Sequence, residues 1–183
     1  MTESIVSPLA TSRRSRFGVA DAERVAVSFG LRGRARELTS ERDQNFLIEN
    51  DGQGIVLKIA NAGEDRAFLE AQHAVLRHLA TRVEVTPRVV PAEGGGSFAE
   101  LNDGDGRRHL VWAVNHLPGR LLARVPYRDD ALYEDLGRRT GDITAGLVGY
   151  DHPAVHRDFY WDLASARAIV VIMIGRKRNT AAS

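Results

Sequence analysis

The residue best placed for chemistry in this sequence is Lys58, in the apolar run 55–59 (IVLKI). Successive side chains of a β-strand point to opposite faces, so Lys58 and Val56 share one face and the other three residues share the second. An ammonium group there, beneath a polar loop, can neutralise phosphate oxygens. The alternative is a lysine that only faces solvent from an amphipathic strand. The polar loop comprises Ser40, Glu41, Arg42, Asp43, Gln44 and Asn45.

Turn-forming residues explain how this loop and the lysine come together. The run 50–54 (NDGQG) lies between two apolar segments, a pattern typical of a β-hairpin. It predicts strands over 45–49 and 55–59, and residues 34–38 can form a third strand. The polar residues 40–45 then connect two strands of one sheet.

A helix is predicted over residues 64–80, where apolar side chains recur at helical spacing. The stripe that would pack on the sheet consists of Phe68, Leu69, Gln72, Leu76 and Leu79. Glu70 lies beside this stripe. It can be a functional carboxylate or an ordinary solvated charge at the edge of the stripe.

The rest of the pattern predicts further strands and two more helices. The strands are expected at 86–91, 97–101 and 109–114, and the helices at 22–29, with Asp21 as cap, and at 129–148. The last strand runs into a Pro-Gly break, 118–119, which predicts a hinge between two lobes. The residues at this exit are Asn115, His116 and Leu117.

Composition excludes several classes of function. The chain has 25 Lys+Arg and 24 Asp+Glu residues, so it lacks the basic excess of a nucleic-acid-binding protein. The absence of cysteine removes disulfides, thiolate catalysis and thiolate metal sites, and fits a cytoplasmic protein. No apolar run approaches the roughly 20 residues of a membrane helix. The Asp/Gly turn 102–106 lacks the closing glutamate of a calcium loop, so no metal site is predicted there.

Three segments together resemble one superfamily. The stretches Ser-Glu-Arg-Asp-Gln-Asn-Phe, Val-Leu-Lys-Ile-Ala-Asn and Phe-Leu-Glu-Ala-Gln are similar to the small lobe of the aminoglycoside phosphotransferase/choline kinase-like superfamily, especially of hydroxylysine kinases and related bacterial phosphotransferase domains. The resemblance runs from about residue 25 to about residue 166. It implies an α+β fold: a twisted antiparallel sheet of about five strands with one packed helix, then a hinge and a partial helical lobe.

The resemblance also implies roles for individual residues. Lys58 would orient the phosphates of ATP, Glu70 would pair with Lys58, and the loop 40–45 would cover the nucleotide. The backbone of Asn115, His116 and Leu117 would meet the edge of the adenine, with a purely structural turn as the alternative.

The family pattern stops before its catalytic part. The His-Gly-Asp loop, the asparagine metal ligand and the metal-binding aspartate of the family are all missing, so no catalytic or magnesium-binding residue is predicted. The tripeptide 156–158 (HRD) is not a kinase catalytic loop, because Leu163 stands where that loop needs asparagine. After residue 168 an apolar run leads into a basic tail, which suggests a truncated or frameshifted reading frame.

These observations predict four segments: a disordered leader (1–17), a kinase-like small lobe (18–117), a hinge with the start of a helical lobe (118–168) and an atypical tail (169–183). The predicted function is the ATP-binding portion of a small-molecule phosphotransferase, inactive alone, whose full-length relatives use magnesium and a small amino-alcohol acceptor. The alternative is a non-catalytic docking module that associates with another polypeptide through exposed apolar surface.

Overall fold

The computed structural model describes residues 16–50, 52–157, 163, 166 and 170. The chain divides into two units, one formed by residues 14–152 and one by residues 1–13 together with 153–183. The described part of the second unit contains one 3-10 turn, Pro153–Val155. The predicted leader up to residue 15, and the predicted tail apart from Val170, lie outside the described residues.

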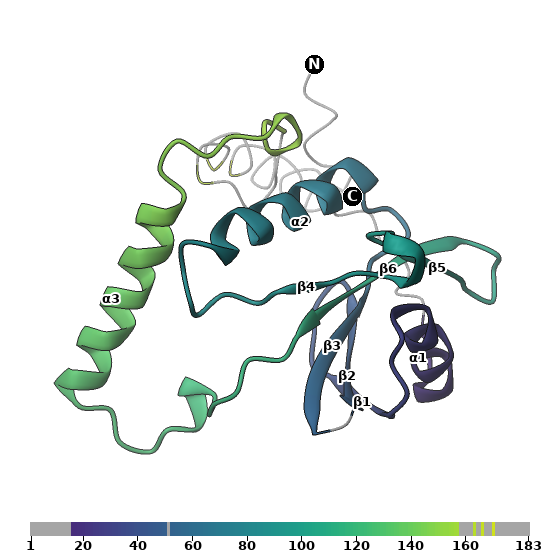
Figure 1. Ribbon diagram of the computed structural model, residues 1–183, viewed down its shortest axis with the longest axis horizontal. Coiled ribbons are helices and arrows are strands. Elements are labelled where there is room, and N and C mark those ends of the chain that lie inside the picture. Colours follow the sequence, from purple (N-terminus) through teal and green to yellow (C-terminus); the bar gives the residue numbers. More distant parts are fainter. Residues whose placement is uncertain (1–15, 51, 158–162, 164–165, 167–169, 171–183) are drawn as a thin grey trace, which may run out of the picture. The chain divides into compact units, whose positions relative to one another are not determined.

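Six strands of the described chain form one antiparallel sheet (Figure 1). The strands are β1 (Arg34–Leu38), β2 (Gln44–Asn50), β3 (Gln53–Ile59), β4 (Val89–Val90), β5 (Ala99–Asn102) and β6 (Arg108–Asn115). Their order is β1-β2-β3-β6-β4, and β5 pairs with β6 off this path. The predicted α+β class and antiparallel sheet are confirmed, with six strands where about five were expected.

Three α-helices accompany the sheet: α1 (Val19–Ala26), α2 (Arg66–Ala80) and α3 (Asp130–Gly146). Four described 3-10 turns are η2 (Val27–Phe29), η3 (Glu93–Gly95), η4 (Leu122–Arg124) and η5 (Pro153–Val155). Asp65 begins α2, since its side chain accepts a hydrogen bond from the backbone N–H of Ala67. α1 begins earlier than predicted, and Asp21 lies in its first turn, where it accepts from the N–H of Gly18 (2.9 Å).

The alternation predicted for β3 is confirmed. Ile55, Leu57 and Ile59 are buried in the hydrophobic core, whereas Val56 and Lys58 on the other face are only half-buried. The core joins this face to α1 and to the neighbouring strands, and it includes Ala22, Val25, Ala26, Phe29, Phe46, Ile48, Val111 and Ala113.

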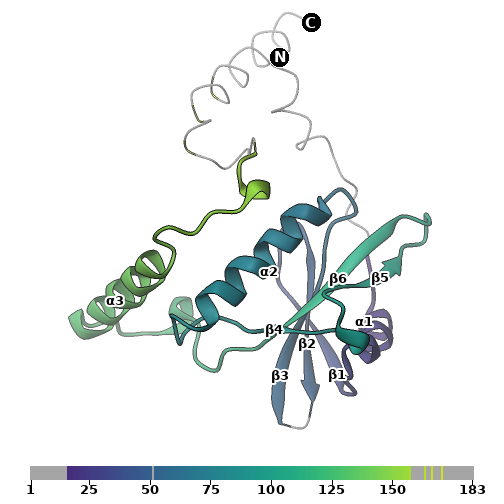
Figure 2. The same cartoon turned by 45° about the horizontal axis from the view of Figure 1, so that its top comes forward.

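The opposite face of the sheet meets α2, so α1 and α2 cover different faces (Figure 2). Contact is made by His73 of α2, whose ring lies 4.7 Å from that of Trp112 of β6, centroid to centroid. Leu69 and Leu79 of the predicted stripe are buried. Its other members are half-buried, and Glu70 is exposed. Lys58 therefore lies on the face that α2 covers.

Phe17, the last residue of the predicted leader, packs in the hydrophobic core. Only 7% of Phe17 is exposed. Its backbone N–H donates to Oε1 of Gln44 (2.7 Å), and its carbonyl accepts from Nε2 of the same side chain (3.3 Å). A buried glutamine thus joins the start of the described chain to β2.

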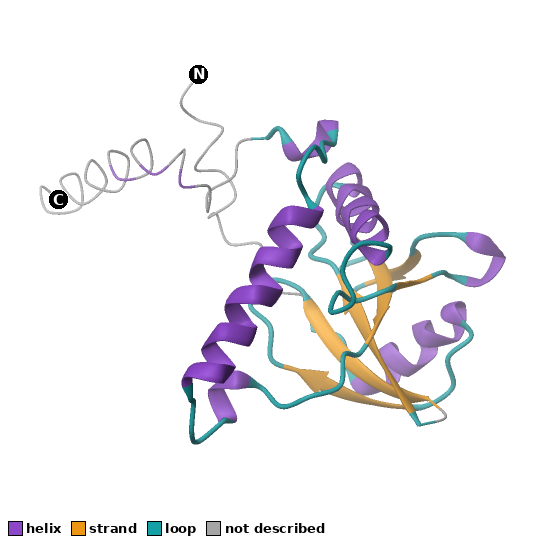
Figure 3. Ribbon diagram, turned by 60° about the vertical axis from the view of Figure 1, so that its left-hand side comes forward, coloured by secondary structure: helices purple, strands orange, loops and turns teal. Residues whose placement is uncertain are grey.

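The helix α3 is attached mainly through its end. Nε2 of His78 in α2 donates to the carbonyl of Gly146, the last residue of α3, at 2.8 Å. The ribbon of α3 lies to one side of the strands, which are orange in Figure 3. No residue of α3 is buried, and Tyr133 and Leu136 are 54% and 45% exposed. Among the described residues, no helix has the length and apolar character needed to cross a membrane.

Candidate functional site

Lys58 is held in place by the two strands that flank β3. The register pairs it with Asn45 on β2 and with Trp112 on β6. Its Nζ donates to Oδ1 of Asn45 at 3.3 Å and lies 5.4 Å from the centroid of the Trp112 ring. Cation–π attraction and a hydrogen bond therefore both restrain the ammonium group. This arrangement differs from a lysine that extends freely into solvent.

The polar loop before β2 is tied to the segment that follows β3. Oδ1 of Asp43 accepts from the backbone N–H of Asn61 (3.3 Å), and Arg42 pairs with Glu64 (3.4 Å). Ser40 donates through its hydroxyl to the carbonyl of Asp43. Glu41 is exposed. These bonds hold the loop at the same end of β3 as Lys58.

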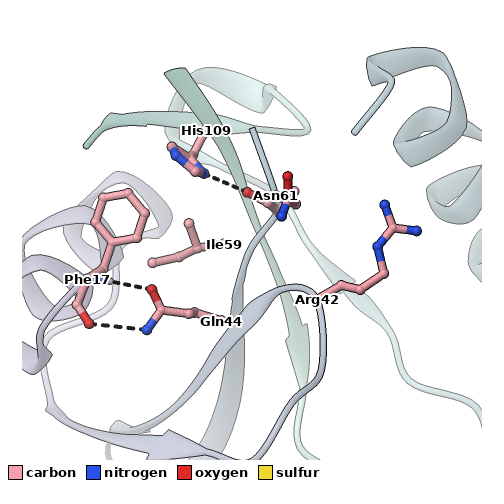
Figure 4. Close-up of a pocket in the computed structure, with 7 residues that line it drawn as sticks. Phe17, Arg42, Gln44, Ile59, Asn61 and His109 are labelled. Atoms are coloured by element: carbon pink, nitrogen blue, oxygen red, sulfur yellow. Dashed lines mark hydrogen bonds between the residues drawn. The ribbon is translucent and has the colours of Figure 1, made fainter. Parts of the chain in front are cut away.

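Gln44, which we assigned to the nucleotide-covering loop, lies on the other face of the sheet. It is a residue of β2, is 5% exposed, and binds the backbone of Phe17 (Figure 4). Neighbouring strand residues point to opposite faces, so Asn45 faces Lys58 and Gln44 faces α1. The physical reason for the difference is that β2 begins one residue earlier than predicted.

A small pocket opens beside Gln44 (Figure 4). Its lining residues are Phe17, Arg42, Gln44, Ile59, Ala60, Asn61 and His109. His109 is 3% exposed, and its Nδ1 lies 2.8 Å from the carbonyl of Ala60, to which it donates. These hydrogen bonds connect Phe17 to β2 and connect β6 to the residue that follows β3. The pocket therefore lies where these segments are held together by bonds within the protein.

Glu70 and Lys58, which we expected to pair, have different partners in this structure. Oε1 of Glu70 accepts from Nε of Arg66 at 3.0 Å, one helical turn earlier. Both side chains of this pair are more than half exposed, at 51% and 57%. Lys58 instead binds Asn45. The Glu70 carboxylate is thus paired with Arg66 in this structure, and the Lys58 ammonium group with Asn45.

A column of side chains in contact links the Lys58–Asn45 pair to the Arg66–Glu70 pair. From Lys58 the column continues through Trp112 to His73, then to Phe98 at 4.5 Å between ring centroids. The guanidinium of Arg66 closes it, 5.2 Å from the Phe98 centroid. Sequence reasoning missed this column. The available signal was the spacing of His73, four residues after Leu69 and three before Leu76 on the apolar stripe.

The central ring of the column is an uncharged histidine at neutral pH. His73 is 1% exposed, and burial lowers its pKa to about 4, with the nearby Arg77 acting in the same direction and Glu70 opposing. Neither ring nitrogen has a hydrogen-bond partner among the described residues. Burial and Arg77 together outweigh the favourable charge of Glu70, so the neutral imidazole is the stable form.

Backbone hydrogen bonds hold the last residue of β6, Asn115, and the next residue, His116, against the sheet. The N–H of Asn115 donates to the carbonyl of Arg88 (3.0 Å), and that of His116 donates to the carbonyl of Gly54 (2.8 Å). Leu117 is 38% exposed, and its N–H has no partner within the described part of the chain. Of the three residues predicted for the hinge, Leu117 is the one with an unused backbone donor.

Between Lys58 and this exit the same face of the sheet is apolar. Leu47, Val56 and Val114 lie side by side, because the register pairs Val56 with both of the others. Leu47 and Val114 are each 7% exposed, and Val56 is half-buried. The face thus combines a cation at one end with an apolar strip leading to a backbone donor.

Possible metal ligands were sought among the described acidic and histidine side chains. Within the described residues there is no group of three or more His, Asp and Glu side chains that could hold a metal ion. We assign no metal ligand.

A twisted antiparallel sheet with a restrained lysine, a helix on the lysine's face and a fastened strand exit define a kinase-like phosphotransferase fold. Residues 34–171 match the phosphotransferase enzyme family, and the chain belongs to this family. Hydroxylysine kinase of Bos taurus is 29% identical over 171 residues, which cover 82% of this chain and 45% of that protein. The chain thus spans less than half the length of this relative.

Solved structures show the same fold. A microcompartment-associated aminopropanol kinase is similar with a TM-score of 0.62 and 22% identity, over 81% of this chain and 46% of its own. An amicoumacin kinase in complex with AMP-PNP, Ca²⁺ and Ami has a TM-score of 0.53 and 16% identity, and the match covers 82% of this chain and 41% of the kinase. A spectinomycin phosphotransferase in complex with ADP and spectinomycin has a TM-score of 0.53 and 10% identity, and the match covers 76% of this chain and 40% of that enzyme.

Proposed function

We propose that this chain binds ATP on the Lys58 face of its sheet, as the nucleotide-binding portion of a small-molecule phosphotransferase. The observation that carries the proposal is the restraint of Lys58 by Asn45 and Trp112 at one end of an apolar strip. A fixed ammonium group can meet phosphate oxygens without first being ordered, and catalysis in this class depends on such positioning.

Each part of the face has a role in the proposed complex. The adenine ring lies on Leu47, Val56 and Val114, and its edge meets the N–H of Leu117. Lys58 contacts the phosphates, and the loop 40–43 covers them together with Asn45. Glu70 leaves Arg66 and pairs with Lys58 once the phosphates are bound, because a second charge then stabilises the ordered ammonium group.

The relatives support this class of ligand and acceptor. Two of the solved structures hold AMP-PNP and ADP, and two matched proteins are kinases of hydroxylysine and aminopropanol, which are both amino alcohols. We therefore propose an amino alcohol as the acceptor of the whole enzyme, and the cytoplasm, where ATP is available, as its location. The isolated chain is proposed to have negligible turnover, because no catalytic aspartate was identified in it.

The test compares ATP with adenosine by calorimetry or NMR titration. We expect ATP to bind the wild type at about millimolar affinity, or roughly −4 kcal/mol. Lys58→Ala should weaken ATP binding and leave adenosine binding unchanged, since the phosphates are the only part of the nucleotide that Lys58 contacts in the proposed complex. Arg24→Ala, which removes an exposed cation of α1 on the opposite face of the sheet, is the matched control and should affect neither. Equal losses for ATP and adenosine in Lys58→Ala would refute the proposal.

A second candidate, a docking module, is favoured by the surface of α3. This helix buries none of its residues, and it exposes Tyr133 and Leu136. An apolar surface of this kind is typical of a contact with another polypeptide. Sedimentation of the wild type and of Tyr133→Ser/Leu136→Ser distinguishes the two cases. A monomeric wild type that binds no apolar dye would exclude the docking function.

A further inference from the structure

We propose that His73 is a positioning residue for Lys58: its neutral ring supports the Trp112 face over which the ammonium group lies. The inference deepens the proposed function, because a correctly placed Lys58 is what the phosphates would meet. His73 does not itself contact the nucleotide in this arrangement.

The geometry of the column carries this inference. Trp112 contacts both residues: its ring centroid lies 5.4 Å from Nζ of Lys58 and 4.7 Å from the imidazole centroid of His73. Phe98 stacks on His73 at 4.5 Å with an angle of 28° between the rings. Removing the middle ring would leave Trp112 without support and would free its indole to change rotamer. Lys58 would then lose the ring that restrains it.

The charges around the column explain why the ring must be neutral. Cations lie on both ends, Lys58 from β3 and Arg66 from α2, and Arg77 and Glu70 of α2 are the other charged groups near His73. A protonated His73 would place a further cation against Trp112, whose ring already interacts with Lys58. Its two unpartnered nitrogens would then be buried N–H donors without acceptors.

The first measurement is independent of any nucleotide. A proton above an indole experiences its ring current, so the NMR shifts of the Lys58 ε-methylene group report how the side chain lies over Trp112. In ligand-free His73→Ala we expect these shifts to move to the values of an unrestrained lysine. His73→Phe, which keeps a neutral ring, should preserve them. Leu76→Ala, a truncation on α2 outside the column, controls for lost stability and should also preserve them.

The second measurement follows protonation. Between pH 7 and pH 4 the Lys58 shifts of the wild type should move together with the titration of His73, and those of His73→Phe should stay constant. This comparison of the wild type with His73→Phe tests the positioning role of His73 even if His73→Ala fails to fold. Unchanged Lys58 shifts in folded His73→Ala, or the same pH dependence in wild type and His73→Phe, would overturn the inference.

The consequence for binding is tested last. The ratio of ATP to adenosine affinity should fall roughly three- to fivefold in His73→Ala, the size of one lost cation–π contact, and stay unchanged in His73→Phe. If the Lys58 shifts depend on His73 but the wild type shows no preference for ATP, the proposed function fails and the positioning role stands. If ATP is preferred and that preference is the same in folded His73→Ala, the positioning role fails and the proposed function stands.

Discussion

Gly54 and His116 touch where β3 meets the exit of β6. The His116 N–H donates to the Gly54 carbonyl at 2.8 Å, and a Cβ built on Gly54 would lie 2.9 Å from the Cβ of His116. The glycine therefore permits a close approach between two strands, at the point where the chain leaves the sheet.

Gly54→Ala should destabilise the protein by about 1–3 kcal/mol, because the added methyl group also meets Leu47 at 3.1 Å and forces the strands apart. Gly137→Ala is the matched control. Among the described residues, nothing outside the local helix backbone lies within 4 Å of a Cβ built at this position of α3, so alanine should stabilise that helix by up to about 1 kcal/mol. Chemical denaturation measures both, and a neutral Gly54→Ala would show that the sheet relaxes freely there.

Stability should depend on pH through His73. Its folded pKa of about 4 lies below the ordinary value of 6.5, so between these values the unfolded chain binds a proton that the folded chain does not. The free energy of unfolding should therefore fall as the pH drops from 6.5 to 4, by up to about 3 kcal/mol from this residue. Denaturation of wild type and His73→Phe at several pH values isolates the contribution. Parallel curves would contradict the prediction.

Gln44→Ala should cost about 1–3 kcal/mol, because it leaves the buried N–H and carbonyl of Phe17 without partners. Glu41→Ala, at an exposed loop position nearby, should be neutral within about 0.5 kcal/mol. Hydrogen exchange at the Phe17 amide gives a local measurement. Unchanged protection in Gln44→Ala would mean that the glutamine does not anchor this segment.

Arg66→Ala should change stability by less than about 1 kcal/mol, since the pair that it forms with Glu70 is exposed. Under the proposed function it should also strengthen ATP binding slightly, because Glu70 is then available to Lys58. Glu70→Gln should have the opposite effect on ATP and none on adenosine. Titration calorimetry measures the ATP and adenosine affinities of both variants. Weakened ATP binding in both would count against the proposal that Glu70 moves from Arg66 to Lys58.

The sequence predicted the faces of β3 well, because strict alternation in a half-buried strand determines which side chains share a face. It assigned Gln44 to the loop, whereas Gln44 is the first residue of β2, where alternation turns its side chain to the face opposite that of Asn45. The Arg66–Glu70 pair could have been expected from i,i+4 spacing on an exposed helix surface. The spacing of His73 on the apolar stripe indicates only that its ring is buried. Its contacts with Phe98 and Trp112 could not be predicted, since these rings come from distant segments whose placement depends on the tertiary fold.

The opposite orientations of Gln44 and Asn45 constrain how this protein can vary. Each amide makes its own anchor, one to Phe17 and one to Lys58, from adjacent positions of one strand. Sliding β2 by a single residue would exchange the two and break both anchors at once. Insertions and deletions in the loop before β2 must therefore be absorbed inside the loop, so its composition is freer to change than the register of the strand that it precedes.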